Sequence, residues 1–152
     1  MIEIREGGLD DRRVQGLLAH HLADAHSDTP PGFRHALDLG GLRDPAITFW
    51  SAWDGETLLG VAALRALTPM HGEIKSMRTA PEHLRRGVGR ALLNHIMRAA
   101  RDRGHTRLSL ETGTSPMFDP ANRLYENFGF VDGPVFGGYP PSPHNRFMHM
   151  TF

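Results

Sequence analysis

The sequence predicts an α/β (α+β) fold in which helices cover the faces of one mixed sheet. Seven segments concentrate or alternate apolar residues as strands do, and four others carry apolar residues at helical spacing. Three successive strands form a meander, and a β-α-β-α-β order then runs toward the C-terminal end. That succession is typical of a mixed sheet with helices on its faces. The 152 residues are enough for one compact core, so we expect a single domain over residues 1–152.

The N-terminal half is predicted to hold one strand, two helices and the meander. The first helix opens at Asp10-Asp11, after which leucine and valine recur at helical spacing. Ser27–Gly32 has the composition of a loop, and Asp54-Gly55 is a strong hairpin signal. The predicted strands are Ile2–Arg5, Ala46–Trp53, Leu58–Leu67 and Gly72–Thr79, and the short second helix is expected at Phe33–Leu39.

The C-terminal half contains the clearest helix of the chain, Val88–Asp102. Its apolar residues form one stripe, and Gly104 follows as a typical stop signal. A second helix is predicted at Pro120–Phe128 and is ended by Gly129. The predicted strands are Thr106–Glu111, Phe130–Phe136 and Arg146–Phe152, the last two joined by a loop rich in glycine and proline.

The composition excludes several classes of site. Cysteine is absent, which excludes disulfides, zinc–thiolate sites and cysteine nucleophiles. No run of about 18 apolar residues is present, and the N-terminus lacks the pattern of a signal peptide. We therefore expect a cytoplasmic protein that acts without a membrane.

The charge is unevenly distributed, although the formal net charge is zero. Residues 71–110 hold nine lysines or arginines and three acids, a local charge of +6. A protein that binds nucleic acid in bulk is usually basic overall, whereas a local basic patch suits a small polyanion. We therefore expect no nucleic-acid partner.

The most informative motif is the glycine pair Gly87 and Gly89, which follows Arg85-Arg86 and begins the clearest helix. Glycine lets backbone N–H groups approach a ligand closely, and a helix N-terminus presents unpaired N–H groups. Arginine adds forked hydrogen bonds to phosphate. The motif therefore predicts a cradle for a pyrophosphate.

Other phosphate and metal motifs fit less well. A dinucleotide fingerprint would need a third glycine where Leu92 stands, and a Gly-Lys-Ser/Thr sequence is absent. The ten histidines do not form a His-Glu-x-x-His pattern, so we expect no metal site. Gly-x-Ser-x-Gly is also absent, which argues against a serine hydrolase.

Three segments in this order and spacing resemble the GCN5-related N-acetyltransferase (GNAT) family. Gly72–Pro81 looks like the family's fourth strand, Arg85–Leu93 like its acyl-CoA pyrophosphate loop, and Ala121–Phe130 like its late helix and turn. The resemblance implies a mostly antiparallel sheet of about seven strands, about four flanking helices, and a splay between strands four and five. Two positions depart from the pattern: Leu84 replaces Gln or Arg, and Phe118 replaces an asparagine that often contacts the cofactor.

The resemblance implies an acyltransferase that moves an acetyl group from acetyl-CoA to the primary amine of a small molecule, by direct attack in a ternary complex. It implies that the backbone around Met77 would pair with the pantetheine arm and stabilise the oxyanion. The cofactor-binding residues would be Met77, Arg78, Thr79, Arg85, Arg86, Gly87, Val88, Gly89, Arg90 and Ala121.

Two side chains match the family's catalytic positions. Glu73 is the first candidate for the base that deprotonates the amine, and Glu111 is the second. Glu73 could instead only position a cation. Tyr125 matches the acid that protonates the leaving thiolate, with a core aromatic as the alternative.

Two other functions remain open at this point: a protein N-terminal or lysine acetyltransferase, and a non-catalytic acyl-CoA-binding regulatory domain. Lys75 and Arg78 could favour an acceptor that carries a carboxylate, and His144 and His149 could line its pocket. Pairing through the closing strands would make a homodimer, as in relatives.

Overall fold

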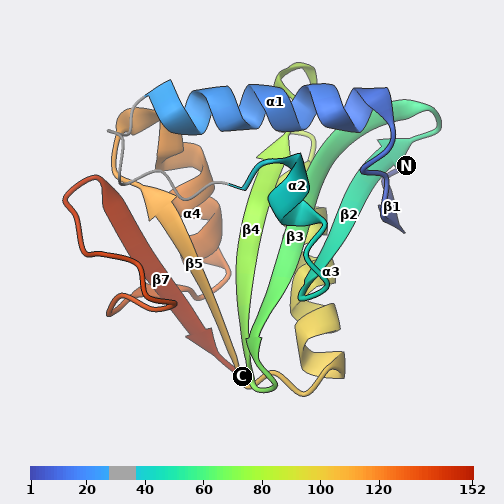
Figure 1. The fold of residues 1–152 in the computed structure, drawn as a ribbon. Helices are drawn as coiled ribbons and strands as arrows, with labels where there is room; N and C mark the ends of the chain where they lie inside the picture. The colour runs from blue at the N-terminus through green and yellow to red at the C-terminus, as the bar shows by residue number, and fades with distance from the viewer. Residues whose placement is uncertain (28–36) are drawn as a thin grey trace.

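The computed structural model describes residues 1–27 and 37–152 and contains one seven-stranded sheet (Figure 1). The strand order is β1-β2-β3-β4-β5-β7-β6, and every neighbouring pair is antiparallel except β4 and β5, which are parallel. This confirms the mixed, mostly antiparallel sheet. The strands are β1 (Glu3–Glu6), β2 (Ile47–Asp54), β3 (Thr57–Thr68), β4 (His71–Thr79), β5 (Arg107–Gly113), β6 (Val131–Asp132) and β7 (Asn145–Thr151).

Helices cover both faces of the sheet. Figure 1 shows α1 and α2 on one face, and α3 and α4 on the other. Their bounds are α1 (Arg12–Ser27), α2 (Leu39–Leu42), α3 (Val88–Asp102) and α4 (Asp119–Asn127), with single 3-10 turns at Pro81–His83 and Pro116–Phe118. None of the helices in the described part of the chain is both long enough and apolar enough to cross a membrane.

Most predicted elements are present within two or three residues, and α3 has the predicted bounds. Residues 28–36 lie outside the described residues, and they hold most of the predicted loop Ser27–Gly32 and the first part of the predicted helix Phe33–Leu39. In the described remainder of that segment, Leu37 and Asp38 are not helical, so the predicted helix is wrong at these two positions. The short helix that the structure describes nearby begins at Leu39. It is capped by Asp38, whose carboxylate accepts a hydrogen bond from the N–H of Gly41 at 2.8 Å.

The predicted strand Phe130–Phe136 is wrong in length, because β6 contains only Val131 and Asp132. Gly133 lies against the ring of His149, so close that a Cβ there would be 2.4 Å from the ring's Cδ2. Pro134 has no N–H for a sheet, and its carbonyl instead accepts a hydrogen bond from His149 Nε2 at 2.7 Å. The chain therefore leaves the sheet and forms a long loop, residues 133–144.

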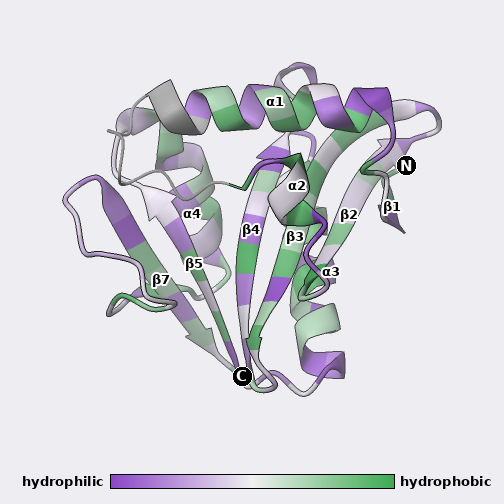
Figure 2. Ribbon diagram, in the orientation of Figure 1, coloured by the Kyte–Doolittle hydropathy of each residue, from purple (hydrophilic) through white to green (hydrophobic). Residues whose placement is uncertain are grey.

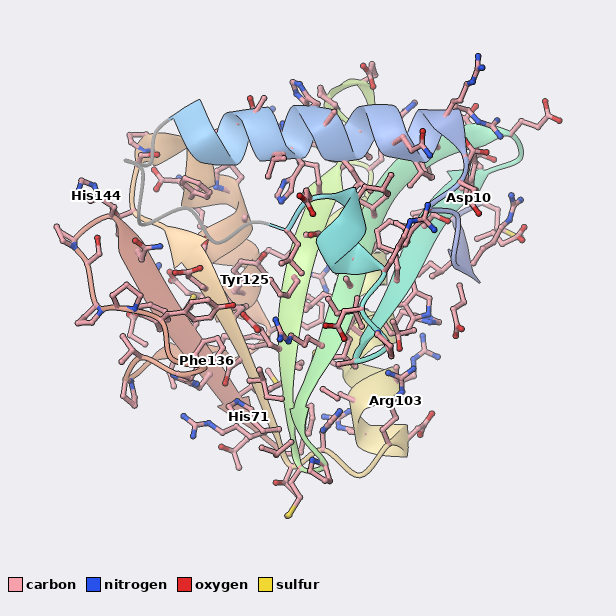
Figure 3. All side chains as sticks on the ribbon, viewed as in Figure 1. Asp10, His71, Arg103, Tyr125, Phe136 and His144 are labelled. Atoms are coloured by element: carbon pink, nitrogen blue, oxygen red, sulfur yellow. The ribbon has the colours of Figure 1, made fainter. Side chains whose placement is uncertain are left out.

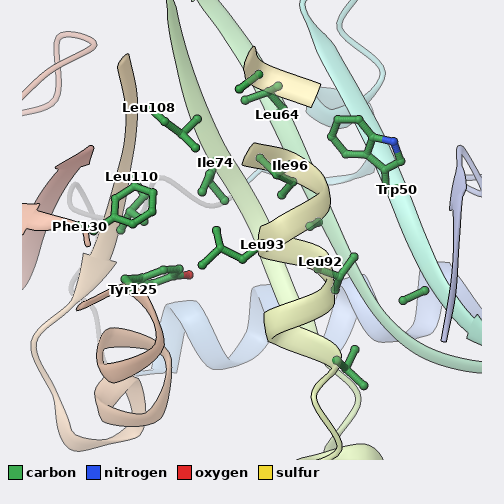
Figure 4. Packing of buried hydrophobic residues seen from close by; sticks show 14 of the residues in the cluster. Trp50, Leu64, Ile74, Leu92, Leu93, Ile96, Leu108, Leu110, Tyr125 and Phe130 are labelled. Carbon is green, nitrogen blue, oxygen red and sulfur yellow. The ribbon is translucent and has the colours of Figure 1, made fainter. Parts of the chain in front are cut away.

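The main core lies between the sheet and α3. Leu92, Leu93 and Ile96 are fully buried against side chains from β3, β4 and β5 (Figure 4). Ile96 follows Leu92 by four residues and Leu93 by three, which places all three on the same side of the helix. This packing fixes the N-terminal end of α3 beside β4.

A second core lies under α1, where Val14, Leu17 and Leu18 pack on Phe49 and Trp53 of β2. Figure 2 shows hydrophilic and hydrophobic residues alternating along α1, as expected of a helix with one buried face. The intervening β2 residues Trp50 and Ala52 belong to the main core, so β2 is buried on both faces.

The parallel pairing of β4 with β5 is short. It joins His71–Ile74 to Arg107–Leu110 and does not extend beyond these residues. Ser76 of β4 has a positive φ of 53°, and the register of β4 against β3 shifts at the same place. This irregularity turns the rest of β4 away from β5.

We expect Leu93→Ala to lower the free energy of unfolding by about 2–5 kcal/mol, because the cavity it leaves is enclosed by the main core. Urea denaturation measures the change. Asn94→Ala, at the exposed neighbouring position, is the matched control and should shift the midpoint little. Equal midpoints for the two variants would contradict this description of the core.

Candidate active site

A cavity of about 540 Å³ occupies the space where β4 and β5 separate. Its walls come from α1, from β4 and β5, from the first turn of α3, from α4, and from His144 and Asn145 where β7 begins. Figure 3 shows Tyr125 on the α4 side of the sheet and His144 at the start of β7. Seven of the predicted site residues line this cavity: Glu73, Met77, Arg78, Thr79, Gly89, Ala121 and Tyr125.

The N-terminus of α3 meets the cavity at Gly89. Gly87 precedes the helix in the left-handed conformation, with φ of 80°, and its carbonyl accepts the N–H of Ala91 at 3.0 Å. The N–H groups of the first turn have no partner within the helix. A Cβ on Gly89 would lie 3.0 Å from Leu124 Cδ2 and would narrow the space above this turn. The site therefore has the unpaired donors and the close backbone approach that a phosphate group needs.

The side chains of the other predicted loop residues do not line the cavity. Val88 is buried in the core, so only its backbone can meet a ligand. Arg86 Nη1 lies 2.7 Å from His83 Nδ1, and its Nη2 lies 3.8 Å from Asp54. The Arg90 guanidinium lies 5.5 Å from the ring centre of Phe128. The structure does bring these cations and Arg85 to the same end of α3 as Gly87 and Gly89.

The segment Met77–Thr79 borders the cavity along an edge of β4 that no strand among the described residues covers. Thr79 pairs with Gly60 of β3 on the other side. The Arg78 side chain forms an ion pair with Asp24 of α1, so it extends toward that helix. An extended ligand with amide groups could pair with this open edge as an added strand does.

Glu73 is 1% exposed and lies on the opposite side of β4 from the core residue Ile74. Its Oε2 accepts the hydroxyl of Tyr139 at 2.8 Å and lies 3.4 Å from Lys75 Nζ. Lys75 Nζ also donates to the Tyr139 hydroxyl at 2.7 Å. Glu73 Oε1 is buried and has no hydrogen-bond partner. One carboxylate oxygen of Glu73 therefore has two polar partners, and the other has no hydrogen bond.

Tyr125 comes from α4 and is 7% exposed. Its ring stands edge-on to Phe130, with 6.0 Å between the centroids (Figure 4). Burial raises the pKa of Tyr125 to about 12, so the phenol keeps its proton well above neutral pH. Tyr125 is both a member of the main core and part of the cavity wall. The two interpretations made from the sequence are compatible.

Of the three other candidate residues, two line the cavity and one does not. Glu111 and His144 line the cavity, and Glu111 Oε2 accepts the side-chain amide of Asn145 at 2.7 Å. His149 does not line it. Instead its Nδ1 lies 2.7 Å from Ser109 Oγ.

Sequence reasoning missed Tyr139 and Asn145. Tyr139 lies 66 residues from Glu73, and no local pattern indicates their contact.

The position of Phe118 differs chemically from the family pattern. Phe118 lines the cavity and lies beside Gly113, where a Cβ would be 2.2 Å from the ring. The hydrogen bonds beside it are made by Asn122. Its Nδ2 donates to the Gly113 carbonyl at 3.1 Å, and its Oδ1 accepts from the Thr112 hydroxyl at 2.8 Å. Asn122 therefore connects α4 to β5 and does not line the cavity.

The other position that departs from the family pattern, Leu84, is exposed at the cavity wall.

His21 of α1 lines the other end of the cavity. Its Nδ1 is buried without a hydrogen-bond partner. Burial and, to a smaller extent, the charge of Arg78 lower the pKa of His21 to about 4. Within the described ranges, no group of three or more histidines and acids is arranged to hold a metal ion.

Comparison with known proteins identifies the family. The model of the Acetyltransferase (GNAT) family matches residues 15–130. The Escherichia coli (strain K12) protein YedL, named as an uncharacterized N-acetyltransferase, is 47% identical over 151 residues, which cover 99% of this chain and 95% of that protein. YsnE of Bacillus subtilis (strain 168), named in the same way, is 48% identical over 147 residues, 97% of each chain. The chain belongs to the GNAT family and is an N-acetyltransferase.

Two solved structures share the fold. A protein described as an acyl-CoA N-acyltransferase from Klebsiella pneumoniae subsp. pneumoniae MGH 78578 has a TM-score of 0.81 and 26% identity, covering 99% of this chain and 97% of that one. A GNAT family acetyltransferase from Elizabethkingia anophelis, solved with acetyl-CoA bound, has a TM-score of 0.71 and 17% identity, with 99% and 98% covered. The splayed seven-stranded sheet is therefore a GNAT fold.

We expect the free energy of unfolding to fall as the pH drops from about 6.5 to 4, with His21 contributing up to about 3 kcal/mol of the loss. The folded state binds a proton on His21 more weakly than the unfolded state, so acid favours unfolding in this interval. His21→Gln should flatten this part of the curve in urea titrations at successive pH values. His20→Gln, its exposed neighbour, is the control. Parallel curves for wild type and His21→Gln would contradict the assignment.

Proposed function

We propose that this protein transfers an acetyl group from acetyl-CoA to the primary amine of a small molecule, by direct attack within a ternary complex. The observation that supports this most strongly is that one cavity joins four features. These are the N-terminal turn of α3, the open edge of β4, the Glu73 carboxylate and the Tyr125 phenol. A volume of about 540 Å³ is in the range of small-molecule sites.

In this proposal acetyl-CoA binds along the path from α3 to the splay. Backbone N–H groups at the start of α3 hold the pyrophosphate, helped by the surrounding guanidinium groups, and the open edge of β4 pairs with the pantetheine amides. The residues assigned to the donor are Met77, Arg78, Thr79, Arg85, Arg86, Gly87, Val88, Gly89, Arg90 and Ala121.

The acceptor amine must lose a proton before it attacks, because a free amine of pKa about 10.4 is almost fully protonated at pH 7. Glu73 is the proposed base, and Glu111 is the alternative on the facing strand. The amine nitrogen then bonds to the thioester carbon, and a backbone N–H near Met77 stabilises the oxyanion. As the carbon–sulfur bond breaks, Tyr125 gives its proton to the thiolate, which leaves as coenzyme A. The attacking nitrogen releases its second proton through solvent in the cavity, which leaves the neutral amide and restores the Tyr125 phenol.

Binding both substrates in one cavity accelerates the reaction by itself. Binding them side by side replaces a bimolecular encounter and can be worth several kcal/mol. For this reason a substitution of Glu73 need not abolish turnover. The homodimer and the cytoplasmic location stay predictions.

Thiol release from acetyl-CoA, measured with a panel of primary amines and with peptides bearing a free N-terminus or lysine, tests the proposal. We expect turnover with one or more small amines and little with peptides. Turnover with peptides alone would favour the protein acetyltransferase. Tight binding of acetyl-CoA with no turnover on any acceptor would favour a regulatory domain that only binds the donor.

We expect Gly89→Val to weaken acetyl-CoA binding at least tenfold, because its side chain would fill the space between the first turn of α3 and Leu124. Isothermal titration calorimetry measures the Kd. Asn94→Val places the same side chain on the exposed face of α3 and is the matched control. An unchanged Kd for Gly89→Val would count against the cradle.

We expect Tyr125→Phe to lower kcat at least tenfold and to leave the Kd of acetyl-CoA nearly unchanged, because the ring stays packed while the proton donor is lost. Steady-state kinetics with the best amine, together with calorimetry, separates these effects. The raised pKa further predicts that any alkaline limb below pH 10 persists in the variant. Wild-type turnover in Tyr125→Phe would remove the acid role.

A further inference from the structure

Tyr139 stands in the loop between β6 and β7 and reaches across to β4. Its hydroxyl donates to Glu73 Oε2 at 2.8 Å and accepts from Lys75 Nζ at 2.7 Å. Lys75 Nζ also lies 5.2 Å from the centre of the Tyr139 ring. Tyr139 is therefore in contact with both members of a buried ion pair in the cavity wall.

The Tyr139 ring is held independently of its hydroxyl. It stacks on Phe147 of β7 with 6.3 Å between centroids, and it stands edge-on to Phe136 at 5.6 Å. Its backbone N–H donates to the carbonyl of Phe136 at 3.1 Å. The tight turn between them contains Gly137 and Gly138, both with positive φ. Removing the hydroxyl should therefore leave the ring in place.

The direction of the Tyr139–Glu73 hydrogen bond follows from chemistry. A carboxylate can only accept, so the phenol donates. Burial raises the pKa of Tyr139, and the nearby charges of Glu73 and Glu111 raise it further, whereas Arg65 opposes them. The phenol is thus a permanent donor to Oε2 at any pH at which the enzyme would work.

This arrangement leaves Glu73 Oε1 as the unsatisfied oxygen. It is buried, without a hydrogen-bond partner, on a side chain that lines the cavity. A buried carboxylate oxygen without an N–H or O–H donor is rare in folded proteins, because leaving it without a hydrogen bond costs free energy. A ligand nitrogen in the cavity would supply the missing donor.

We infer, on the basis of the acetyl transfer proposed above, that Tyr139 is a positioning residue for Glu73. Together with Lys75 it holds the carboxylate through Oε2 and so reserves Oε1 for an N–H of the acceptor amine. Tyr139 itself does not touch the reacting atoms. The loop between β6 and β7 thus acts on the acceptor through Glu73.

A double-mutant cycle tests this inference, because a residue that acts through Glu73 loses its effect when Glu73 is changed. Tyr139→Phe should lower kcat/KM for the best amine of the panel about tenfold in the wild-type background, as expected for a lost hydrogen bond to a charged group. In the Glu73→Gln background the same change should cost less than about twofold. The same loss in both backgrounds would overturn the inference.

A second measurement needs no acceptor. Carbon-13 NMR of glutamate-labelled protein follows the Glu73 carboxyl carbon, assigned with Glu73→Gln, through a pH titration. Its midpoint should lie at higher pH in Tyr139→Phe than in wild type, because the charged form has lost a donor. The exposed Glu126 is the internal reference and should not move. Equal Glu73 midpoints would overturn the inference.

Calorimetry with acetyl-CoA separates this inference from the proposed function. Tyr139→Phe should bind acetyl-CoA as wild type does, since Tyr139 is not among the residues assigned to the donor. If wild type itself bound no acetyl-CoA, the proposed function would fail, while the NMR titration would still report on the contact between Tyr139 and Glu73.

Discussion

The end of parallel pairing between β4 and β5, after Ile74 and Leu110, is the constraint on which the rest of this structure depends. Both residues are buried against α3, and this packing holds the two strands together up to that point. Beyond it, the irregularity at Ser76 turns β4 away and leaves backbone groups without a strand to pair with. Unpaired backbone groups inside a protein must find partners, so a split of this kind is stable only where water or a ligand enters. The cavity at the split follows from this requirement.

The buried pair Glu73 and Lys75 also needs an explanation. Removing two charges from water costs several kcal/mol each, and their attraction returns this only with good geometry and further hydrogen bonds. The nitrogen–oxygen distance is 3.4 Å and one carboxylate oxygen has no partner, so the pair falls short of that geometry. Apolar residues at positions 73 and 75 would stabilise the sheet at least as well. The pair is therefore better explained by the chemistry of the cavity than by stability.

The parts of the fold that the sequence predicted well are those with local causes. The apolar stripe and Gly104 predicted the bounds of α3, and Gly87 and Gly89 marked its N-terminal end. The length of β6 could not be predicted, because it depends on contact of Gly133 with His149, 16 residues away. The same holds for Tyr139, whose partner Glu73 lies in another part of the chain. Arg78 shows a third limit: its side chain pairs with Asp24, which lies 54 residues away, and no local pattern indicates this ion pair.

The split also explains how the two proposed catalytic side chains can serve one reaction. Glu73 lies on the face of the sheet opposite to Ile74, and Tyr125 packs on the same side as Ile74. In an unbroken sheet, strand-to-strand hydrogen bonds would separate them. Where β4 and β5 diverge, one cavity reaches both. In the proposed reaction an amine on the Glu73 side and a leaving thiolate on the Tyr125 side can then meet at the same carbonyl carbon, so the base and the acid need not compete for one position.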